Sequence, residues 1–290
     1  MKTIVVIADH FGLTTNAIEQ ASYLSLAIQA KLHVVFFHYE DITDMGSKGE
    51  AFKDALMQRL TEKATHLQNE LSHPLPYSSD VVWQQDITTW VNHYVTIHDV
   101  AMVVKTAHCT DALFYTPTDW ALLRECPAPI LIASKKHWRR SHDILACVDL
   151  QSKDESKQQL NQHILSSACH LAKRLDVKVQ VLYVPPFSSV LRDLGVQFKD
   201  EIEIKAEHAL ADQIHTLTKQ YQLSEQQFYI HAGKPWQVIP SIAAKVRCQL
   251  VVLGTVGRRG IGQKVLGNTA EKILRRLKTN VLALKPSYPP

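Results

Sequence analysis

The sequence VVLGTVGRRGIGQKVLGNTAE occupies residues 251–271 and sets the fold of the second half of the chain. Its first part, Val251–Leu253, is a short apolar run typical of a buried parallel strand. A glycine-rich loop follows, and a predicted helix then begins at Asn268 or Thr269. A strand, a glycine loop and a helix in this order indicate an α/β fold.

The glycine loop has the chemistry of a phosphate site. Four glycines fall within nine residues: Gly254, Gly257, Gly260 and Gly262. Glycine tolerates positive φ and lets the backbone approach a ligand closely, and successive N–H groups in such turns attract anions. The helix start adds free N–H groups, and Asn268 and Thr269 suit a helix cap. The alternative is a tight strand-to-helix turn without a ligand. The loop is not a P-loop, because it lacks G-x-x-x-x-G-K-[ST].

Length and composition narrow the class of protein. A chain of 290 residues predicts two domains, and 46% hydrophobic with 21% charged residues is an ordinary globular composition. The sequence has no apolar run of membrane-spanning length, and its first residues lack the pattern of a signal peptide. The five scattered cysteines form no C-x-x-C pair. We therefore expect a cytoplasmic protein with reduced thiols and no membrane partner.

Charge is distributed unevenly along the chain. Residues 1–140 hold 12 Lys and Arg against 15 Asp and Glu, whereas residues 141–290 hold 20 against 13. Part of this excess flanks the glycine loop, at Arg258, Lys264 and Lys272 among others, and suits an anionic ligand. For the basic residues after Lys272 we prefer a solvated helix face. Nucleic acid is not expected as a partner, since no aromatic residues or reader motif accompany the charge.

The order of predicted elements occurs twice. Predicted strands in the first half cover residues 3–8, 32–38, 79–83, 100–104 and 130–133. Predicted strands in the second half cover residues 144–148, 177–184, 227–231, 250–253 and 281–284. Helical patterns separate them, and Pro240 should kink or delay the helix predicted at 236–246. We expect two domains, 1–137 and 143–290, joined by a charged connector.

Parallel sheets of this kind bind ligands at the carboxyl ends of strands, where the strand order reverses. In a five-stranded sheet this point lies between strands one and four. Strand one of the second half ends at Asp149, and strand four ends at Gly254. A carboxylate for a ribose hydroxyl or a base edge would then face a glycine loop for phosphates. The alternative role for Asp149 is a helix cap.

These residues resemble a known family. Asp149, together with Gly254-x2-Gly257-x9-Gly267 before a helix, resembles the ATP-binding pattern of universal stress proteins, G-2x-G-9x-G-[ST]. The stretches 252–258 and 267–271, and TPTDW at 116–120 in the first half, are similar to a bacterial member with two domains in tandem. The resemblance covers the whole chain.

The resemblance implies two Rossmann-like domains with parallel strands in the order 3-2-1-4-5, packed as an internal pseudo-dimer. It implies a stress-response protein with ATP or a related nucleotide in the second domain. Adenine and ribose would lie near Asp149. The phosphates and adjoining groups would meet a set of loop residues: Gly254, Thr255, Gly257, Arg258, Gly267, Asn268 and Thr269. Asn268 departs from the Ser or Thr of the pattern, and Thr269 would supply the hydroxyl instead.

The first half departs from the pattern completely. Aligning the repeats sets Lys105 against Gly254, His108 against Gly257 and Thr116 against Gly267, so we expect no ATP there. The same loop brings His108, Cys109 and Asp111 close in sequence. These are zinc-capable groups, but their spacing matches no zinc signature, and an ordinary polar loop is the preferred interpretation.

We expect a ligand-binding protein and not an enzyme. The sequence contains no nucleophile elbow and no H-E-x-x-H motif, and no general base for hydrolysis is identifiable. The alternatives are a weak ATPase or nucleotide switch, and a scaffold that holds a hydrophobic or nucleotide-sugar ligand in the same crevice. The sequence does not fix the oligomeric state, and a homodimer stays open.

Overall fold

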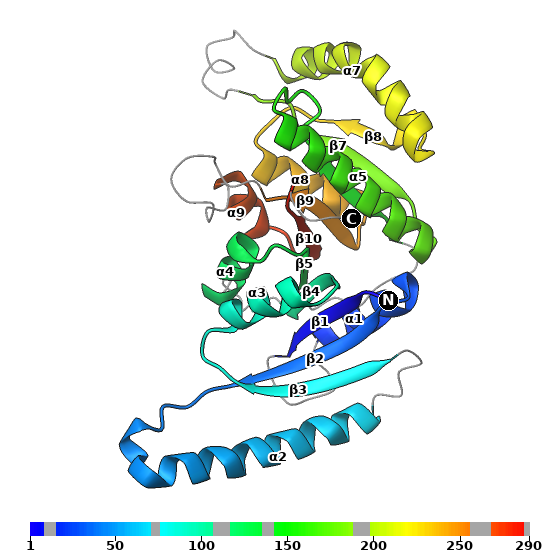
Figure 1. The fold of residues 1–290 in the computed structure, drawn as a ribbon. Coiled ribbons are helices and arrows are strands. Elements are labelled where there is room, and N and C mark those ends of the chain that lie inside the picture. The colour runs from blue at the N-terminus through cyan, green and yellow to red at the C-terminus, as the bar shows by residue number, and fades with distance from the viewer. Residues whose placement is uncertain are drawn as a thin grey trace. The chain divides into compact units, whose positions relative to one another are not determined.

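The computed structural model describes residues 1–8, 16–70, 76–106, 117–134, 142–187, 198–255 and 268–286. Two compact units divide these residues (Figure 1). The first unit holds the described residues up to 134, and the second holds those from 142 onward. Each unit is a parallel sheet with covering helices.

The first unit contains five described strands: β1 (Thr3–Ala8), β2 (Lys31–His38), β3 (Tyr77–Trp83), β4 (Val100–Thr106) and β5 (Ile130–Ala133). They pair in parallel in the order β3-β2-β1-β4-β5. Its helices are α1 (Asn16–Ile28), a 3-10 helix (Thr43–Lys48), α2 (Gly49–Glu70), α3 (Ile87–Ile97) and α4 (Pro117–Glu125). Helix α1 packs on β1 and β4, and α3 packs on α4.

The second unit repeats this plan in its described residues. Its strands are β6 (Ile144–Val148), β7 (Val179–Tyr183), β8 (Phe228–Ile230), β9 (Leu250–Gly254) and β10 (Asn280–Leu284), all parallel, in the order β8-β7-β6-β9-β10. Its helices are α5 (Glu155–Leu175), α7 (Lys199–Tyr221), a 3-10 helix (Glu225–Gln227), α8 (Pro235–Lys245) and α9 (Asn268–Leu274). Helix α5 packs on β6 and β9, as α1 does on β1 and β4, and α8 packs on α9.

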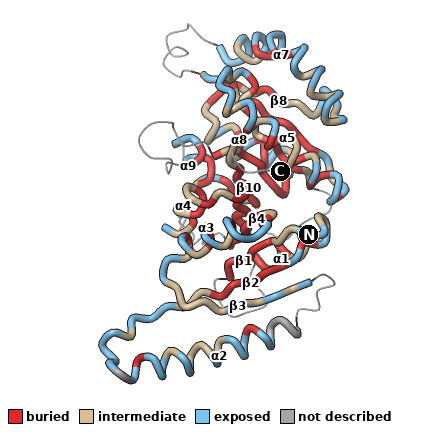
Figure 2. Tube along the Cα trace, viewed as in Figure 1, coloured by how far each residue is buried: buried red, intermediate tan, exposed pale blue. Residues whose placement is uncertain are grey.

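The central strands of each sheet are buried, as the red segments of Figure 2 show. Strands β1 and β9 consist almost wholly of buried aliphatic residues, because helices leave little of a parallel sheet exposed. Helices α1 and α5 both end at a residue in the left-handed region, Gln29 and Asp176, each with φ of 55°. Helix α7 ends in the same way, at Gln222.

The predicted strands are all present, and the predicted order 3-2-1-4-5 is confirmed in each unit. The differences lie at the ends: β3 begins at Tyr77 rather than residue 79, and β4 continues through Thr106. Pro240 does not delay the helix, since α8 begins at Pro235 and continues through Pro240. Among the described residues, no helix is long and apolar enough to cross a membrane.

Candidate functional site

A cavity of about 750 Å³ opens in the second unit at the carboxyl ends of β6 and β9. This volume lies within the range of about 300–1,000 Å³ common for small-molecule sites. The cavity lies where the strand order reverses, as expected for this kind of sheet. The start of α5 lines it, as do the start of α8 and α9.

Asp149 stands at the mouth of the cavity, directly after β6, and two side chains of α5 hold it. The Asn161 amide forms two hydrogen bonds with its backbone: Asn161 Oδ1 accepts from Asp149 N–H at 2.9 Å, and Nδ2 donates to Asp149 O at 2.8 Å. Lys157 Nζ lies 3.0 Å from Asp149 Oδ2. Both members of this ion pair are about half exposed. The carboxylate is thus fixed in position but open to a ligand.

The cap of α5 is Asp154. Its Oδ1 accepts from the N–H groups of Ser156 and Lys157, at 2.9 and 3.3 Å. The alternative interpretation of Asp149 as the cap of this helix is therefore wrong. The N-cap side chain accepts from N–H groups of the first turn, and Asp154 fills this position, so Asp149 is not the cap.

Gly254 is the last residue of β9 and lines the cavity. It does not take a left-handed conformation, so the first of the two reasons that the sequence suggested for these glycines does not hold here. A Cβ at this position would lie 2.3 Å from Leu160 Cδ2 and 2.8 Å from Leu160 Cγ. Glycine is needed because buried Leu160 of α5 packs directly on the strand.

Asn268 and Thr269, at the start of α9, line the same cavity as Asp149 and Gly254. Thr255 does not line it: its N–H and its hydroxyl both donate to the carbonyl of Leu284, at 2.8 and 3.2 Å. That side chain therefore holds β9 to the end of β10. The other predicted site residues, Gly257, Arg258 and Gly267, lie outside the described residues.

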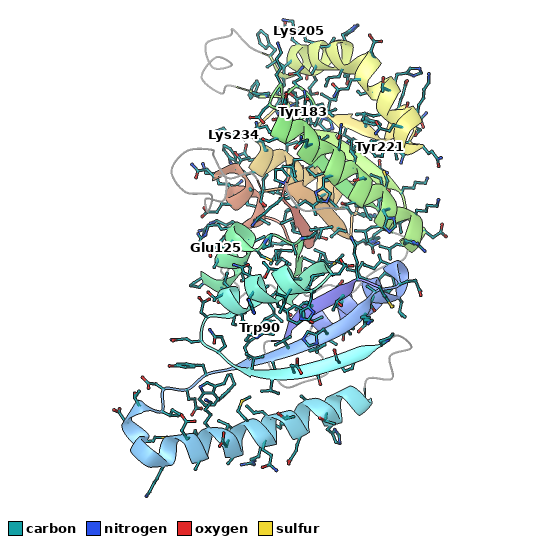
Figure 3. The ribbon with its side chains drawn as sticks, in the orientation of Figure 1. Trp90, Glu125, Tyr183, Lys205, Tyr221 and Lys234 are labelled. Carbon is teal, nitrogen blue, oxygen red and sulfur yellow. The ribbon has the colours of Figure 1, made fainter. Side chains whose placement is uncertain are left out.

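Part of the cavity wall is apolar. Leu182, Tyr183, Pro235 and Ile239 contribute to it. The Tyr183 hydroxyl, on a residue labelled in Figure 3, donates to Gln151 Oε1 at 2.9 Å. Burial, together with the negative charge of Asp149, raises the pKa of Tyr183 to about 12. The phenol is therefore neutral at physiological pH, and the side chain is buried in the wall.

Cys147 of β6 also lines the cavity. Burial, and secondarily the nearby Cys248, raises the pKa of the Cys147 thiol well above its usual range. The thiolate is the nucleophilic form of cysteine. Cys147 is consequently an unreactive part of the wall at neutral pH.

The first unit differs at the equivalent strand end. Lys105, the counterpart of Gly254, is buried in β4 and its Nζ lies 3.0 Å from Asp119 Oδ1. Asp119 comes from the first turn of α4 and is also buried. A side chain stands where the second unit has a glycine, and it is committed to an internal ion pair.

The zinc alternative gains no support from the described residues. Among them, no group of three His, Cys, Asp or Glu side chains is placed to hold a metal ion. His108, Cys109 and Asp111 themselves lie outside the described residues.

Comparison with known proteins identifies the family. The sequence model described as the universal stress protein family matches residues 141–285, which is half of the chain. The chain belongs to the universal stress protein family. The resemblance drawn from the glycine pattern is confirmed.

Curated universal stress proteins match nearly the full length. Universal stress protein E of Escherichia coli K12 is 29% identical over 302 residues, covering 98% of this chain and 94% of the relative. A universal stress protein E homolog of Haemophilus influenzae is 28% identical over 283 residues, covering 93% and 90%. These matches confirm the narrower resemblance to universal stress protein E that residues 116–120 indicate. A solved protein of unknown function from Pseudomonas aeruginosa PAO1 has the same fold, with a TM-score of 0.72, 25% identity, and coverage of 98% of this chain and 92% of its own.

The sequence did not predict much of the cavity wall in this universal stress fold. Lys157 and Asn161 were not predicted, nor were the apolar residues Tyr183 and Ile239. A signal for Asn161 was present, because this polar residue directly follows Leu160 at the start of the apolar stripe of α5. The apolar wall gave no separate signal, since strand ends and helix starts of this kind are apolar whether or not they line a cavity.

Proposed function

We propose that the second unit of this stress protein binds ATP or a related nucleotide in the cytoplasm, without turning it over. One observation carries the proposal: a single cavity brings together the Asp149 carboxylate and the Asn268–Thr269 helix start. Carboxylates recognise ribose hydroxyls or base edges, and amide and hydroxyl groups donate hydrogen bonds to phosphate oxygens.

The apolar and the polar lining residues match the two ends of a nucleotide. Apolar lining residues such as Val184 and Pro235 suit a base, whereas Asn268 and Thr269 suit phosphates. The glycine motif that follows β9 in sequence supplies further backbone N–H groups. In this arrangement the base lies against the apolar wall, the ribose meets Asp149, and the phosphates run toward α9.

Binding without hydrolysis fits the described carboxylates of the cavity wall. Hydrolysis needs a carboxylate or another base to position the attacking water. Asp154 is occupied by the first turn of α5, and Asp149 is assigned to the ribose hydroxyls in this proposal. Neither of these carboxylates is set up as a general base.

Calorimetric titration of ATP into the ligand-free protein tests the proposal. We expect saturable binding that disappears in Gly257→Glu, because a carboxylate would enter the phosphate region. Gln159→Glu is the matched control: it adds the same charge at an exposed position of α5 and should leave binding unchanged. Equal thermal unfolding of both variants would show that the fold is intact. Absence of ATP binding by the wild-type chain would contradict the proposal.

The apolar wall also favours a second candidate, a hydrophobic or nucleotide-sugar ligand in the same cavity. Mass spectrometry of small molecules released from the purified, denatured protein separates the candidates. Recovery of ATP or another simple nucleotide supports the first, and recovery of a lipid or a sugar nucleotide supports the second. Accumulation of ADP during incubation with ATP would instead indicate a weak ATPase.

A further inference from the structure

Lys157 has an unusual position for a cation. It is the third residue of α5, within the first turn, where the positive end of the helix dipole disfavours a positive side chain. Its ammonium group is directed to Asp149 Oδ2 at 3.0 Å and lines the cavity. The carboxylate of Asp149 beside it offsets this unfavourable interaction.

The described wall has little positive charge to offer a phosphate. Its charged side chains are Asp149, Asp154 and Lys157. Asp154 is held by its role as the cap of α5. Within the part of the wall that the structure describes, a phosphorylated ligand therefore meets two carboxylates and one ammonium group. Lys157 is the described side chain that can offset the phosphate charge.

The ion pair between Lys157 and Asp149 is easily exchanged. Both side chains are about half exposed, at 44% and 47%, and ion pairs open to water contribute little net stability. The backbone of Asp149 is held independently by Asn161. The carboxylate can therefore change its partner without moving the strand end.

We propose that Lys157 leaves Asp149 when a nucleotide binds and pairs with its phosphate. The ribose hydroxyls then take the place of the ammonium group at Asp149. This inference rests on the proposed nucleotide function and adds a specificity determinant to it: Lys157 makes the site select phosphorylated nucleotides over nucleosides. Charge-assisted hydrogen bonds to phosphate are stronger than neutral ones, so the selectivity should be measurable.

The test compares the affinities for ATP and adenosine in four proteins by calorimetry. These are the wild-type chain, Lys157→Gln, Lys157→Arg and Lys153→Gln. Lys153 is a matched control, since it is an exposed lysine four residues earlier, before α5 begins, and is not among the described residues that line the cavity. Lys153→Gln thus removes the same charge without removing the contact.

We expect Lys157→Gln to weaken ATP binding about tenfold, which corresponds to about 1.4 kcal/mol. Adenosine binding should be unchanged or tighter, because Asp149 is then free for the ribose. Lys157→Arg should retain most of the ATP affinity, and Lys153→Gln should change it less than twofold.

Three results would overturn the role of Lys157 while leaving the nucleotide site intact. The first is that Lys157→Gln weakens the binding of ATP and of adenosine equally. The second is that Lys157→Gln binds both more tightly. The third is that Lys157→Gln has the same ATP affinity as Lys153→Gln. Failure of the wild-type chain to bind ATP is a different outcome, because it overturns the proposed function and this inference with it.

Discussion

The two units share a strand order but differ at the end of the fourth strand. In the second unit Gly254 lets Leu160 pack against the strand, and a cavity opens beside it. In the first unit Lys105 projects a long side chain from the equivalent position and pairs with Asp119. The end of the fourth strand therefore lines a proposed ligand site in the second unit, whereas in the first unit it carries one member of a buried ion pair.

This difference shows how one residue type changes the use of a strand end. A glycine leaves its space to a neighbouring helix and to a ligand, whereas a buried lysine must bring its own counter-charge. Asp119 provides that charge from α4, and the aligned position in the second unit is Ala270. Lys105 and Asp119 of the first unit therefore depend on each other, because each is the buried counter-charge of the other.

The largest effect should come from breaking the ion pair. Asp119→Ala leaves the Lys105 ammonium buried without this carboxylate and should destabilise the first unit by about 3–5 kcal/mol. Hydrogen exchange measured by mass spectrometry should show faster exchange in β4 and β5, with β9 and β10 unchanged. The double variant Lys105→Met with Asp119→Leu should recover most of the loss, because a buried ion pair can be replaced by apolar residues of similar volume. Exchange that rises equally in both units would contradict this assignment.

A smaller effect is expected from adding one methyl group in the second unit. Gly254→Ala sets a Cβ against Leu160, and overpacking of this kind costs about 1–3 kcal/mol. Urea unfolding measures the loss. The cost of Gly254→Ala should shrink when Leu160→Ala is already present, since the clashing atoms are then gone. An equal cost in both backgrounds would mean that Leu160 is not the reason for the glycine.

The smallest effect concerns Tyr183 and alkaline pH. Its pKa of about 12 exceeds the value of about 10 in the unfolded chain. The unfolded state therefore loses its proton first, and the stability contributed by Tyr183 is present below pH 10 and is lost as the pH rises toward 12. Tyr183→Phe should flatten the loss of stability over this interval.

At neutral pH the same variant loses its hydrogen bond to Gln151, at a cost of about 0.5–1.5 kcal/mol. Urea unfolding at pH 7 and at several values from 10 to 12 measures both effects. An unchanged alkaline slope in Tyr183→Phe would show that another group controls it. Tyr77 of the first unit has a pKa that burial raises to about 12, so Tyr77→Phe is the matched comparison.

The fold could be predicted from the sequence because its signals are local and occur twice. The apolar runs at residues 3–8 and 144–148 form strands with the predicted bounds. The glycine spacing and Asp149 indicated the family and one edge of the site. These features depend on residues close together in the chain, which a periodicity or a motif can reveal.

The rest of the site depends on contacts between distant residues. The reason for Gly254 lies in Leu160, more than ninety residues earlier in the chain. The partner of Lys105 is Asp119, which belongs to the TPTDW stretch that was used only as a family signature. The proposed role of Lys157 depends on its position beside Asp149 and the cavity. No pattern within one element contains this information.

The number of nucleotides bound per chain tests the central claim most directly, because the claim is that the two units differ in their ability to hold a nucleotide. Native mass spectrometry of the ligand-free protein with excess ATP gives this number. We predict one ATP per chain for the wild-type protein and none for Gly257→Glu. Two ATP molecules per chain, or one that persists in Gly257→Glu, would contradict the account, because the first unit would then bind a nucleotide despite Lys105.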